Sequence, residues 1–239
     1  MAETGSTNAD VAAAARAGEP EGLVLVAESQ TTGRGRLNRT WHAPPRSGLM
    51  FSLLLRPENI AGTHWSWAPL LVGVAANAAL RRLTQLDVRV KWPNDLLIGD
   101  RKVAGILVER VGDALVVGMG LNVTMRADEL PTPSATSLAL AGATITDRDP
   151  LLRAILREIA HWYAQWRAVE GDPEASGLRT AYHQQCATLG QQVRIELPED
   201  QDWVGEAVNV DAAGRLLVRT GQGEAALSAG DVIHVRAAC

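Results

Sequence analysis

Residues 88–119 read VRVKWPNDLLIGDRKVAGILVERVGDALVVGM, and this stretch decides the fold class. Gly99-Asp100 and Gly112-Asp113 are typical tight-turn pairs. They separate three short apolar runs of the kind found in buried strands, at residues 88–90, 103–109 and 114–119. The stretch therefore predicts a meander of antiparallel strands.

Helical patterns lie on both sides of this meander. An alanine-rich run at residues 9–17 follows Ser6-Thr7-Asn8, which predicts a capped helix start. Residues 65–86 are rich in alanine and leucine and predict a long helix, and residues 174–185 predict a short one. Residues 151–169 predict a helix with one stripe facing the core, formed by Leu152, Ile155, Ile159, Trp162 and Trp166.

The remaining patterns complete the predicted architecture. Apolar runs at residues 23–27 and 49–55 predict two more buried strands, joined by a polar loop. We therefore expect an α+β fold with a mixed or antiparallel sheet flanked by helices. Residues 191–236 change to short alternating strands, which predicts a small β-barrel from about residue 188. The expected domains are residues 1–187 and 188–239.

Composition limits the class of protein. The chain has 239 residues, 46% of them hydrophobic, which suffices for a large core. Its net charge of −4 predicts no general attraction to nucleic acid or to anionic lipid. The first residues lack the basic and apolar run of a signal peptide, and no apolar stretch reaches membrane-spanning length. We therefore expect a cytoplasmic protein without a nucleic-acid or membrane partner.

Cysteine and histidine placement argues against several kinds of site. Cys186 and Cys239 are far apart and have no further ligand at metal-binding spacing, which predicts a core thiol and a terminal thiol. The five histidines share no metal-binding spacing, and no nucleophilic serine or cysteine motif is present. The sequence therefore does not predict a zinc site or covalent catalysis.

Residues 33–41, GRGRLNRTW, place three arginines and two glycines in the loop between two predicted strands. Glycine lets the backbone approach a phosphate closely, and arginine donates through a planar fork that matches phosphate oxygens. The segment therefore predicts a phosphate-binding loop, although a solvated arginine-rich loop would show the same pattern. Trp41 could cover a purine ring or anchor the loop in the core.

Two further features carry chemistry. Lys91 ends a predicted strand in KWPND, where its ammonium could neutralise an activated carboxylate or an α-phosphate. A surface lysine at a strand end is the alternative interpretation. Alternating Gly118 and Gly120 would leave a smooth sheet face for a flat ligand, and Gly105 could allow a similar close approach. The spacing lacks the third glycine and the helix start of a dinucleotide fingerprint, so a bulged strand is the alternative.

Five segments together resemble the biotin protein ligase family, in the order that the family shows: GSTN at residues 5–8, QTTGRGR at 30–36, KWPND at 91–95, KVAGIL at 102–107 and GLN at 120–122. The resemblance spans nearly the whole chain. It implies a seven-stranded mixed sheet similar to class II aminoacyl-tRNA synthetase cores, followed by a small SH3-like β-barrel. It also implies adenylation of biotin by ATP and transfer of biotin to a protein lysine.

The resemblance implies roles for individual residues. Lys91 and Arg36 would be catalytic, with Lys91 bridging the biotin carboxylate and the α-phosphate. The residues expected to bind biotin are Ser6, Thr7, Asn8, Gln30, Arg34, Gly35, Arg36, Lys91, Gly105, Gly118 and Gly120. The residues expected to bind the nucleotide are Arg36, Arg39, Trp41, Lys91 and Asn122. Mg²⁺ would be held largely by the phosphates, with unknown protein ligands.

Several expectations about partners follow from the same resemblance. The acceptor would be the biotin carboxyl carrier domain of acetyl-CoA carboxylase or of a related biotin-dependent carboxylase. The protein would be a monofunctional ligase without a DNA-binding domain, and a monomer or weak dimer. One departure is Asn38, where the family usually has glycine; asparagine tolerates the left-handed conformation that such a turn requires.

Two other functions compete with this interpretation. One is a lipoate or octanoate protein ligase, an enzyme of similar fold. Against it, the polar side chains of Ser6, Thr7, Asn8 and Gln30 suit a ureido ring better than a dithiolane or an acyl chain. A regulator that binds biotin or a nucleotide without catalysis is the third alternative. Lys91 and Arg36 argue against that alternative.

Overall fold

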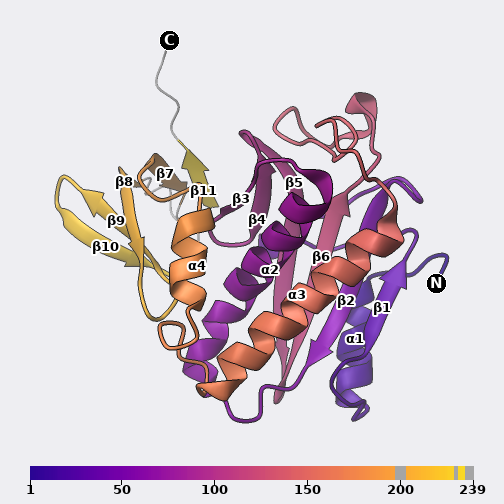
Figure 1. Cartoon of the computed structure of the whole chain (residues 1–239), viewed down its shortest axis with the longest axis horizontal. Coiled ribbons are helices and arrows are strands. Elements are labelled where there is room, and N and C mark those ends of the chain that lie inside the picture. Colours follow the sequence, from indigo (N-terminus) through magenta and orange to yellow (C-terminus); the bar gives the residue numbers. More distant parts are fainter. Residues whose placement is uncertain (197–202, 229–230, 235–239) are drawn as a thin grey trace.

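A computed structural model describes residues 1–196, 203–228 and 231–234, and it contains two antiparallel sheets (Figure 1). The larger sheet has six strands in the order β1-β2-β6-β5-β4-β3, and the smaller has five in the order β10-β9-β8-β7-β11. Helices pack against the larger sheet, so the expected α+β class is confirmed. The resemblance implied a seven-stranded mixed sheet; instead, parallel contacts of the larger sheet are limited to isolated bridges.

The larger sheet contains the predicted meander. Its strands are β1 Val24–Ala27, β2 Gly48–Leu55, β3 Val88–Lys91, β4 Asp95–Ile98, β5 Arg101–Val111 and β6 Ala114–Asn122. The sequence patterns did not single out β4, because its apolar run is only Leu96, Leu97 and Ile98. Pairing with β3 and β5 on its two sides extends this short run into a strand.

Helices cover the two faces of the larger sheet unequally. Helix α1 (Thr7–Arg16) covers one end of one face, where Val11, Ala12 and Ala15 pack on Leu54 and Val116. On the other face lie α2 (Ala68–Thr84), preceded by the 3-10 helix η2 (Gly62–Trp67), and α3 (Arg148–Ala168). The short helix α4 (Leu178–Gln185) packs beside α2.

Side chains alternate between these faces along the strands, and this alternation positions the site. In β2, Leu49, Phe51, Leu53 and Leu55 enter the main core beneath α2 and α3. Of their even-numbered neighbours, Ser52 and Leu54 contact residues of α1, whereas Met50 packs with Ala43 and Met125. Because α1 covers only part of its face, the remainder is open to a ligand.

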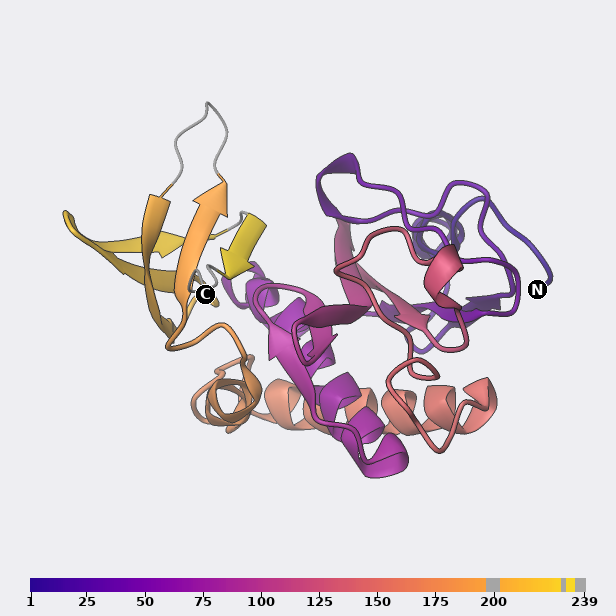
Figure 2. The same cartoon turned by 90° about the horizontal axis from the view of Figure 1, so that it is seen from above.

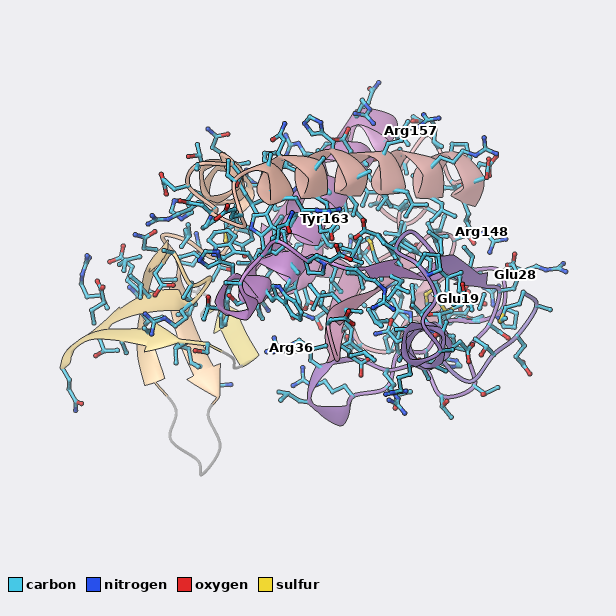
Figure 3. The ribbon with its side chains drawn as sticks, turned by 90° about the horizontal axis from the view of Figure 1, so that it is seen from below. Glu19, Glu28, Arg36, Arg148, Arg157 and Tyr163 are labelled. Carbon is cyan, nitrogen blue, oxygen red and sulfur yellow. The ribbon has the colours of Figure 1, made fainter. Side chains whose placement is uncertain are left out.

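Most helix predictions agree with the structure in type and place. In the predicted stripe of α3, Ile155, Ile159 and Trp166 are buried, and Leu152 and Trp162 are partly buried against the core. Figure 3 shows α3 on the opposite side of the sheet from Arg36. The predicted capping of α1 is wrong in detail, because Ser6 stands at the N-cap position but makes no side-chain capping bond.

The smaller sheet is the C-terminal β-structure that the sequence predicted. Its strands are β7 Gln192–Glu196, β8 Trp203–Val210, β9 Leu216–Thr220, β10 Gly223–Leu227 and β11 Asp231–His234. Figure 2 shows this sheet beside one end of α2 and α4, on the opposite side of the molecule from α1. Cys186 is a buried core thiol as predicted, whereas Cys239 lies outside the described residues.

The turn between β8 and β9 is bound directly to the first part of the chain. The Trp67 indole N–H donates to the carbonyl oxygen of Ala212 at 2.7 Å, and the Trp92 indole donates to that of Gly214 at 3.1 Å. The Ser66 hydroxyl donates to the carbonyl oxygen of Ala213 at 2.7 Å. These bonds hold the smaller sheet against η2 and against the segment that follows β3.

Across the three described ranges of the chain, no helix combines the length and the apolar character that crossing a bilayer requires.

Candidate active site

A cavity of about 420 Å³ opens on the α1 face of the larger sheet. Every residue that the sequence analysis assigned to a site lines this one cavity: Ser6, Thr7, Asn8, Gln30, Arg34, Gly35, Arg36, Arg39, Trp41, Lys91, Gly105, Gly118, Gly120 and Asn122. These residues come from segments far apart in the sequence. Their convergence is what a binding site for one small ligand requires.

Strand register explains how the floor of the cavity is built. Lys91 pairs with Asp95, Asp95 with Gly105, and Gly105 with Gly120, so these four residues form one row across β3, β4, β5 and β6. Residues opposite each other in antiparallel strands share a face of the sheet. The row is therefore charged at one end and flat at the other.

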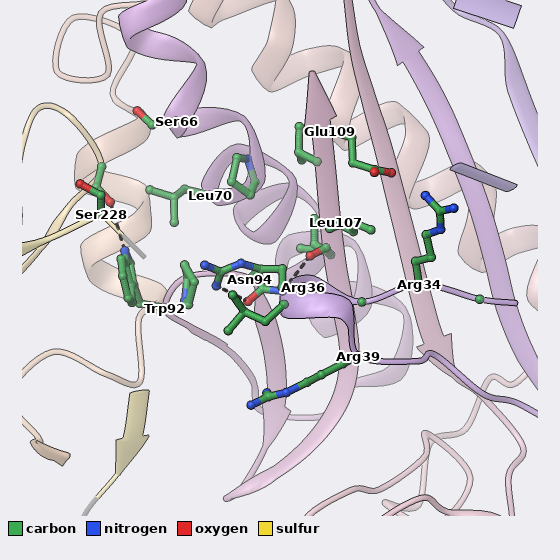
Figure 4. Close-up of a pocket in the computed structure, with 18 of the residues that line it drawn as sticks. Arg34, Arg36, Arg39, Ser66, Leu70, Trp92, Asn94, Leu107, Glu109 and Ser228 are labelled. Atoms are coloured by element: carbon green, nitrogen blue, oxygen red, sulfur yellow. Dashed lines mark hydrogen bonds between the residues drawn. The ribbon is translucent and has the colours of Figure 1, made fainter. Parts of the chain in front are cut away.

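The arginine-rich loop folds back on itself over this floor. Gly35 N donates to the Arg39 carbonyl oxygen at 2.7 Å, and Trp41 N donates to that of Gly33 at 2.9 Å. Gly33 is required here, because a Cβ atom would lie 2.4 Å from the Trp41 carbonyl oxygen. The side chains of Arg34, Arg36 and Arg39 extend from the loop in different directions (Figure 4).

The left-handed residue of this loop is not the one that the sequence suggested. Leu37, inside the 3-10 turn η1 (Arg36–Asn38), has φ of 53° and ψ of 41°. We expected the family's glycine position, Asn38, to need this conformation. Leu37 is also 64% exposed, so a branched apolar side chain stands in solvent at the loop tip, on a backbone that such residues rarely adopt.

The charged end of the floor holds an excess of cations. Burial lowers the pKa of Lys91, Asp95 opposes that shift, and Lys102 and Arg39 add to it. Burial likewise lowers the pKa of Arg36, against an opposing effect of Asp95. Like charges held together in a partly buried site favour binding of an anion, which relieves their repulsion.

Lys102 belongs to the site although the sequence analysis gave it no role. Its Nζ atom lies 2.7 Å from Asp95 Oδ1 and 5.8 Å from the centre of the Trp41 ring. A Cβ atom on Gly105 would lie 3.2 Å from the same Nζ atom, so Lys102 lies directly over the flat part of the floor. The motif KVAGIL contains both Lys102 and Gly105, but only Gly105 was assigned to the site from the sequence.

The glycines of the floor make room for protein side chains as well as for a ligand. A Cβ atom on Gly120 would lie 2.2 Å from Trp41 Cε2, and one on Gly118 would lie 2.0 Å from Asn8 Oδ1. The expected smooth face is therefore already covered in part, by Trp41 at one glycine and by Asn8 at the other. The Trp41 Nε1 atom is buried and has no hydrogen-bond partner among the described residues.

A polar cluster forms the α1 end of the cavity. Gln30 Oε1 accepts from the Thr7 backbone N–H at 2.8 Å and lies 3.1 Å from Thr7 Oγ1. Ser52, a fully buried serine of β2, lies 2.7 Å from Thr7 Oγ1 and 2.6 Å from Asn8 Oδ1. Sequence reasoning missed Ser52, because one serine in an apolar strand carries no signal of its own.

Asn122 ends β6 and closes the other side of the cavity. Its side chain is buried, and its Nδ2 group donates to the Thr136 carbonyl oxygen at 2.9 Å. This bond fixes the amide next to the Trp41 end of the floor. The family resemblance implied that Asn122 contacts the nucleotide.

A second, larger cavity of about 1070 Å³ adjoins the first and is shown in Figure 4. Arg34, Arg36 and Arg39 line both cavities. The larger one continues past Trp92 to the turn between β8 and β9. The Arg36 Nη1 group donates to Asn94 Oδ1 at 3.2 Å, which holds Arg36 at the boundary between them.

The carboxylates of the cavity suit a metal ion held mainly by other ligands. The described residues contain no group of three or more histidine, cysteine, aspartate or glutamate side chains that could hold a metal ion. Asp95 and Asp100 are the carboxylates among the residues that line the smaller cavity. Mg²⁺ commonly binds one or two carboxylates together with substrate phosphates, and these residues fit that mode.

Comparison with known proteins agrees with this geometry. The pattern of the Biotin/lipoate A/B protein ligase family matches residues 6–125, and that of the Biotin protein ligase C terminal domain matches residues 188–235. The chain is 40% identical to the biotin–[acetyl-CoA-carboxylase] ligase of Mycobacterium tuberculosis, over 99% of this chain and 88% of that one. It is 30% identical to the ligase of the same name from Paracoccus denitrificans, over 97% and 98%.

A solved structure shows the same architecture. The biotin protein ligase from Aquifex aeolicus, in complex with biotin and ATP, superposes with a TM-score of 0.80 at 28% identity, covering 99% of this chain and 97% of that one. Sequence, fold and the convergence of the predicted residues thus agree, and the chain belongs to the biotin protein ligase family.

Proposed function

We propose that this protein adenylates biotin with Mg-ATP to biotinyl-5′-AMP and transfers biotin to a lysine of a biotin carrier domain. The proposal rests on the side chains that line one cavity: a polar cluster lies at one end and an excess of cations at the other. Relatives named as biotin–[acetyl-CoA-carboxylase] ligases support the activity and suggest acetyl-CoA carboxylase as the source of the acceptor.

The proposed first step is formation of a mixed anhydride. A carboxylate oxygen of biotin attacks the α-phosphorus of ATP, and the bond from that phosphorus to the bridging oxygen breaks, releasing pyrophosphate. Arg36, Lys91 and Lys102 stabilise the negative charge that accumulates on the phosphorus centre. Mg²⁺, held by phosphates and a carboxylate such as Asp95 or Asp100, would neutralise further phosphate charge.

The proposed second step is acyl transfer. The uncharged ε-amine of the acceptor lysine attacks the carbonyl carbon, the bond to the phosphate oxygen breaks, AMP leaves, and the amine releases a proton to water. Correct placement of the two reactants supplies much of the rate acceleration in such a reaction. The adjoining larger cavity gives an acceptor chain a route to the cation-rich end.

The residue roles implied by the family resemblance remain proposals. Biotin would lie against Ser6, Thr7, Asn8, Gln30, Arg34, Gly35, Arg36, Lys91, Gly105, Gly118 and Gly120. The nucleotide would lie against Arg36, Arg39, Trp41, Lys91 and Asn122. We further propose that residues 1–187 form the catalytic domain and residues 188–239 a small C-terminal β-domain.

Pyrophosphate release from Mg-ATP tests the proposal, with biotin, lipoate, octanoate or no acid added to the purified protein. Of the acids tested, we expect only biotin to give release, because a dithiolane or an acyl chain offers Thr7 and Gln30 no hydrogen bond. Release with lipoate or octanoate instead would identify a lipoate-type ligase. Absence of release with every acid would favour a binding protein without catalysis.

A further inference from the structure

Ser52 and Glu109 are connected to the ligand cavity through Asn8. The Asn8 Nδ2 group donates to Glu109 Oε2 at 2.7 Å and to the Leu107 carbonyl oxygen at 3.4 Å. The Asn8 Oδ1 atom lies 2.6 Å from the Ser52 hydroxyl, which in turn lies 2.7 Å from the Thr7 hydroxyl. No sequence motif predicted a role for Ser52 or for Glu109.

Glu109 determines which atom donates in each hydrogen bond of the series from Glu109 through Asn8 and Ser52 to Thr7. A carboxylate and a backbone carbonyl can only accept, so they face the amide NH₂ of Asn8 and turn its oxygen toward Ser52. An amide oxygen also only accepts, so Ser52 gives its one hydroxyl proton to Asn8. The short contact between Ser52 and Thr7 then needs the proton of Thr7.

Thr7 is left as an acceptor toward the cavity. Its one hydroxyl proton is within hydrogen-bond distance of two oxygens, Gln30 Oε1 at 3.1 Å and Ser52 Oγ at 2.7 Å, and the shorter contact takes it. Gln30 Oε1 also accepts the Thr7 backbone N–H. With the Thr7 proton directed to Ser52, Thr7 Oγ1 and Gln30 Oε1 are neighbouring acceptors, and both residues line the cavity. A ligand N–H can donate a hydrogen bond to such a pair of partly buried acceptors and so stabilise it. A hydrocarbon chain or a dithiolane has no donor and cannot do so.

The sheet is built to admit this chain of bonds. Ser52 pairs with Gly118 across β2 and β6, and Gly118 pairs with Leu107 across β6 and β5. The Asn8 amide occupies the space that a Gly118 side chain would fill, since a Cβ atom there would lie 2.8 Å from Asn8 Cγ. Ser52 is the polar member of an otherwise apolar and fully buried strand.

We propose that Ser52 and Glu109 are positioning residues that make Thr7 and Gln30 a receptor for an N–H donor, and so select a cyclic urea over other carboxylic acids. The inference deepens the proposed function and rests on it. Neither residue needs to touch the ligand. Both act by fixing the proton of Thr7.

Calorimetric binding of biotin without ATP tests the proposal, using Ser52→Ala, Glu109→Met and Glu109→Gln. We expect Ser52→Ala and Glu109→Met each to weaken biotin binding about tenfold, the scale of one lost hydrogen bond. Glu109→Gln should bind biotin nearly normally, because its amide oxygen can still accept from Asn8. In pyrophosphate release, the KM for biotin should rise while the KM for ATP and kcat stay close to wild type.

Two controls separate positioning from loss of structure. Thr84→Val removes a buried hydroxyl of α2 that bonds the Leu80 carbonyl at 2.7 Å, and it should lower stability without changing biotin affinity. In a Thr7→Val background, adding Ser52→Ala should have no further effect on biotin affinity. Equal losses from Ser52→Ala in both backgrounds would overturn the inference.

The ligand itself supplies a second test. Biotin analogues that carry a ring oxygen in place of one ureido N–H are cyclic carbamates of nearly the same size. Wild type should bind at least one of the two regioisomers about tenfold more weakly than biotin, and Ser52→Ala should reduce that difference. Equal affinity of wild type for biotin and both carbamates would overturn the inference, whereas no binding of biotin to wild type would refute the proposed function itself.

Discussion

Substitution of Gly120 by alanine tests the arrangement of Trp41 on the floor of the cavity. The new Cβ atom would lie 2.2 Å from Cε2, 2.5 Å from Nε1 and 2.6 Å from Cζ2 of the indole. Ordinary carbon contacts are about 3.5–4.0 Å, so the ring would have to move by roughly 1 Å or more. Overpacking of this kind typically costs about 1–3 kcal/mol.

Urea unfolding of four proteins measures this cost: wild type, Gly120→Ala, Trp41→Ala and the double variant. We expect Gly120→Ala to lower the free energy of unfolding by about 1–3 kcal/mol in the presence of Trp41. In the Trp41→Ala background the same change should be neutral, or stabilise by up to roughly 1 kcal/mol, because alanine restricts the unfolded chain. An equal destabilisation in both backgrounds would show that another neighbour, not the indole, requires glycine at this position.

Four further predictions concern the charges, the loop and the contact with the smaller sheet. Lys102→Ala should lower kcat for pyrophosphate release by about 10²–10³, the scale for one preorganised charge, and a loss under tenfold would exclude it from the reaction centre. Burial lowers the Lys91 pKa in the folded protein below 10.5, its ordinary value in the unfolded chain. At pH values between these two pKa values, the unfolded chain therefore binds more protons than the folded protein. Stability of the ligand-free protein should therefore increase with pH in that window, and Lys91→Met should flatten the increase in thermal unfolding scans. Biotin with Mg-ATP should protect residues 34–39 from limited proteolysis, and unchanged cleavage there would count against ordering of the loop by phosphate. Trp67→Phe, which removes the N–H bonded to Ala212, should lower the free energy of unfolding in urea by about 1–3 kcal/mol, and an unchanged value would show that this bond adds nothing.

The motifs predicted which residues meet, because each carries its chemistry in a short segment. GRGR, KWPND and the glycines of β6 converge on one cavity, and residues 88–119 form the expected antiparallel strands. The α+β class was predictable for a similar reason, since strand and helix periodicities are local properties of the sequence.

Sequence reasoning failed where a role depends on an unpredicted neighbour. Ser52 is one hydroxyl in an apolar strand, and only the packing of α1 shows that it meets Asn8. Lys102 was read as part of a motif, and only the hairpin of β4 and β5 brings it to Asp95. The left-handed residue was expected at Asn38 and lies at Leu37, because the closure of the loop, not residue preference, determines the backbone there.

The turn between β8 and β9 has a consequence for how this protein can change over evolutionary time. Trp67, Trp92 and Ser66 donate to backbone carbonyl oxygens of this turn, and every amino acid possesses such an oxygen. Ala212 and Ala213 can therefore be replaced without loss of the bonds, whereas Gly214, with φ of +75°, depends on its lack of a side chain. The sequence of this turn can therefore diverge at Ala212 and Ala213 while the contact between the two sheets persists, provided that the turn keeps its shape.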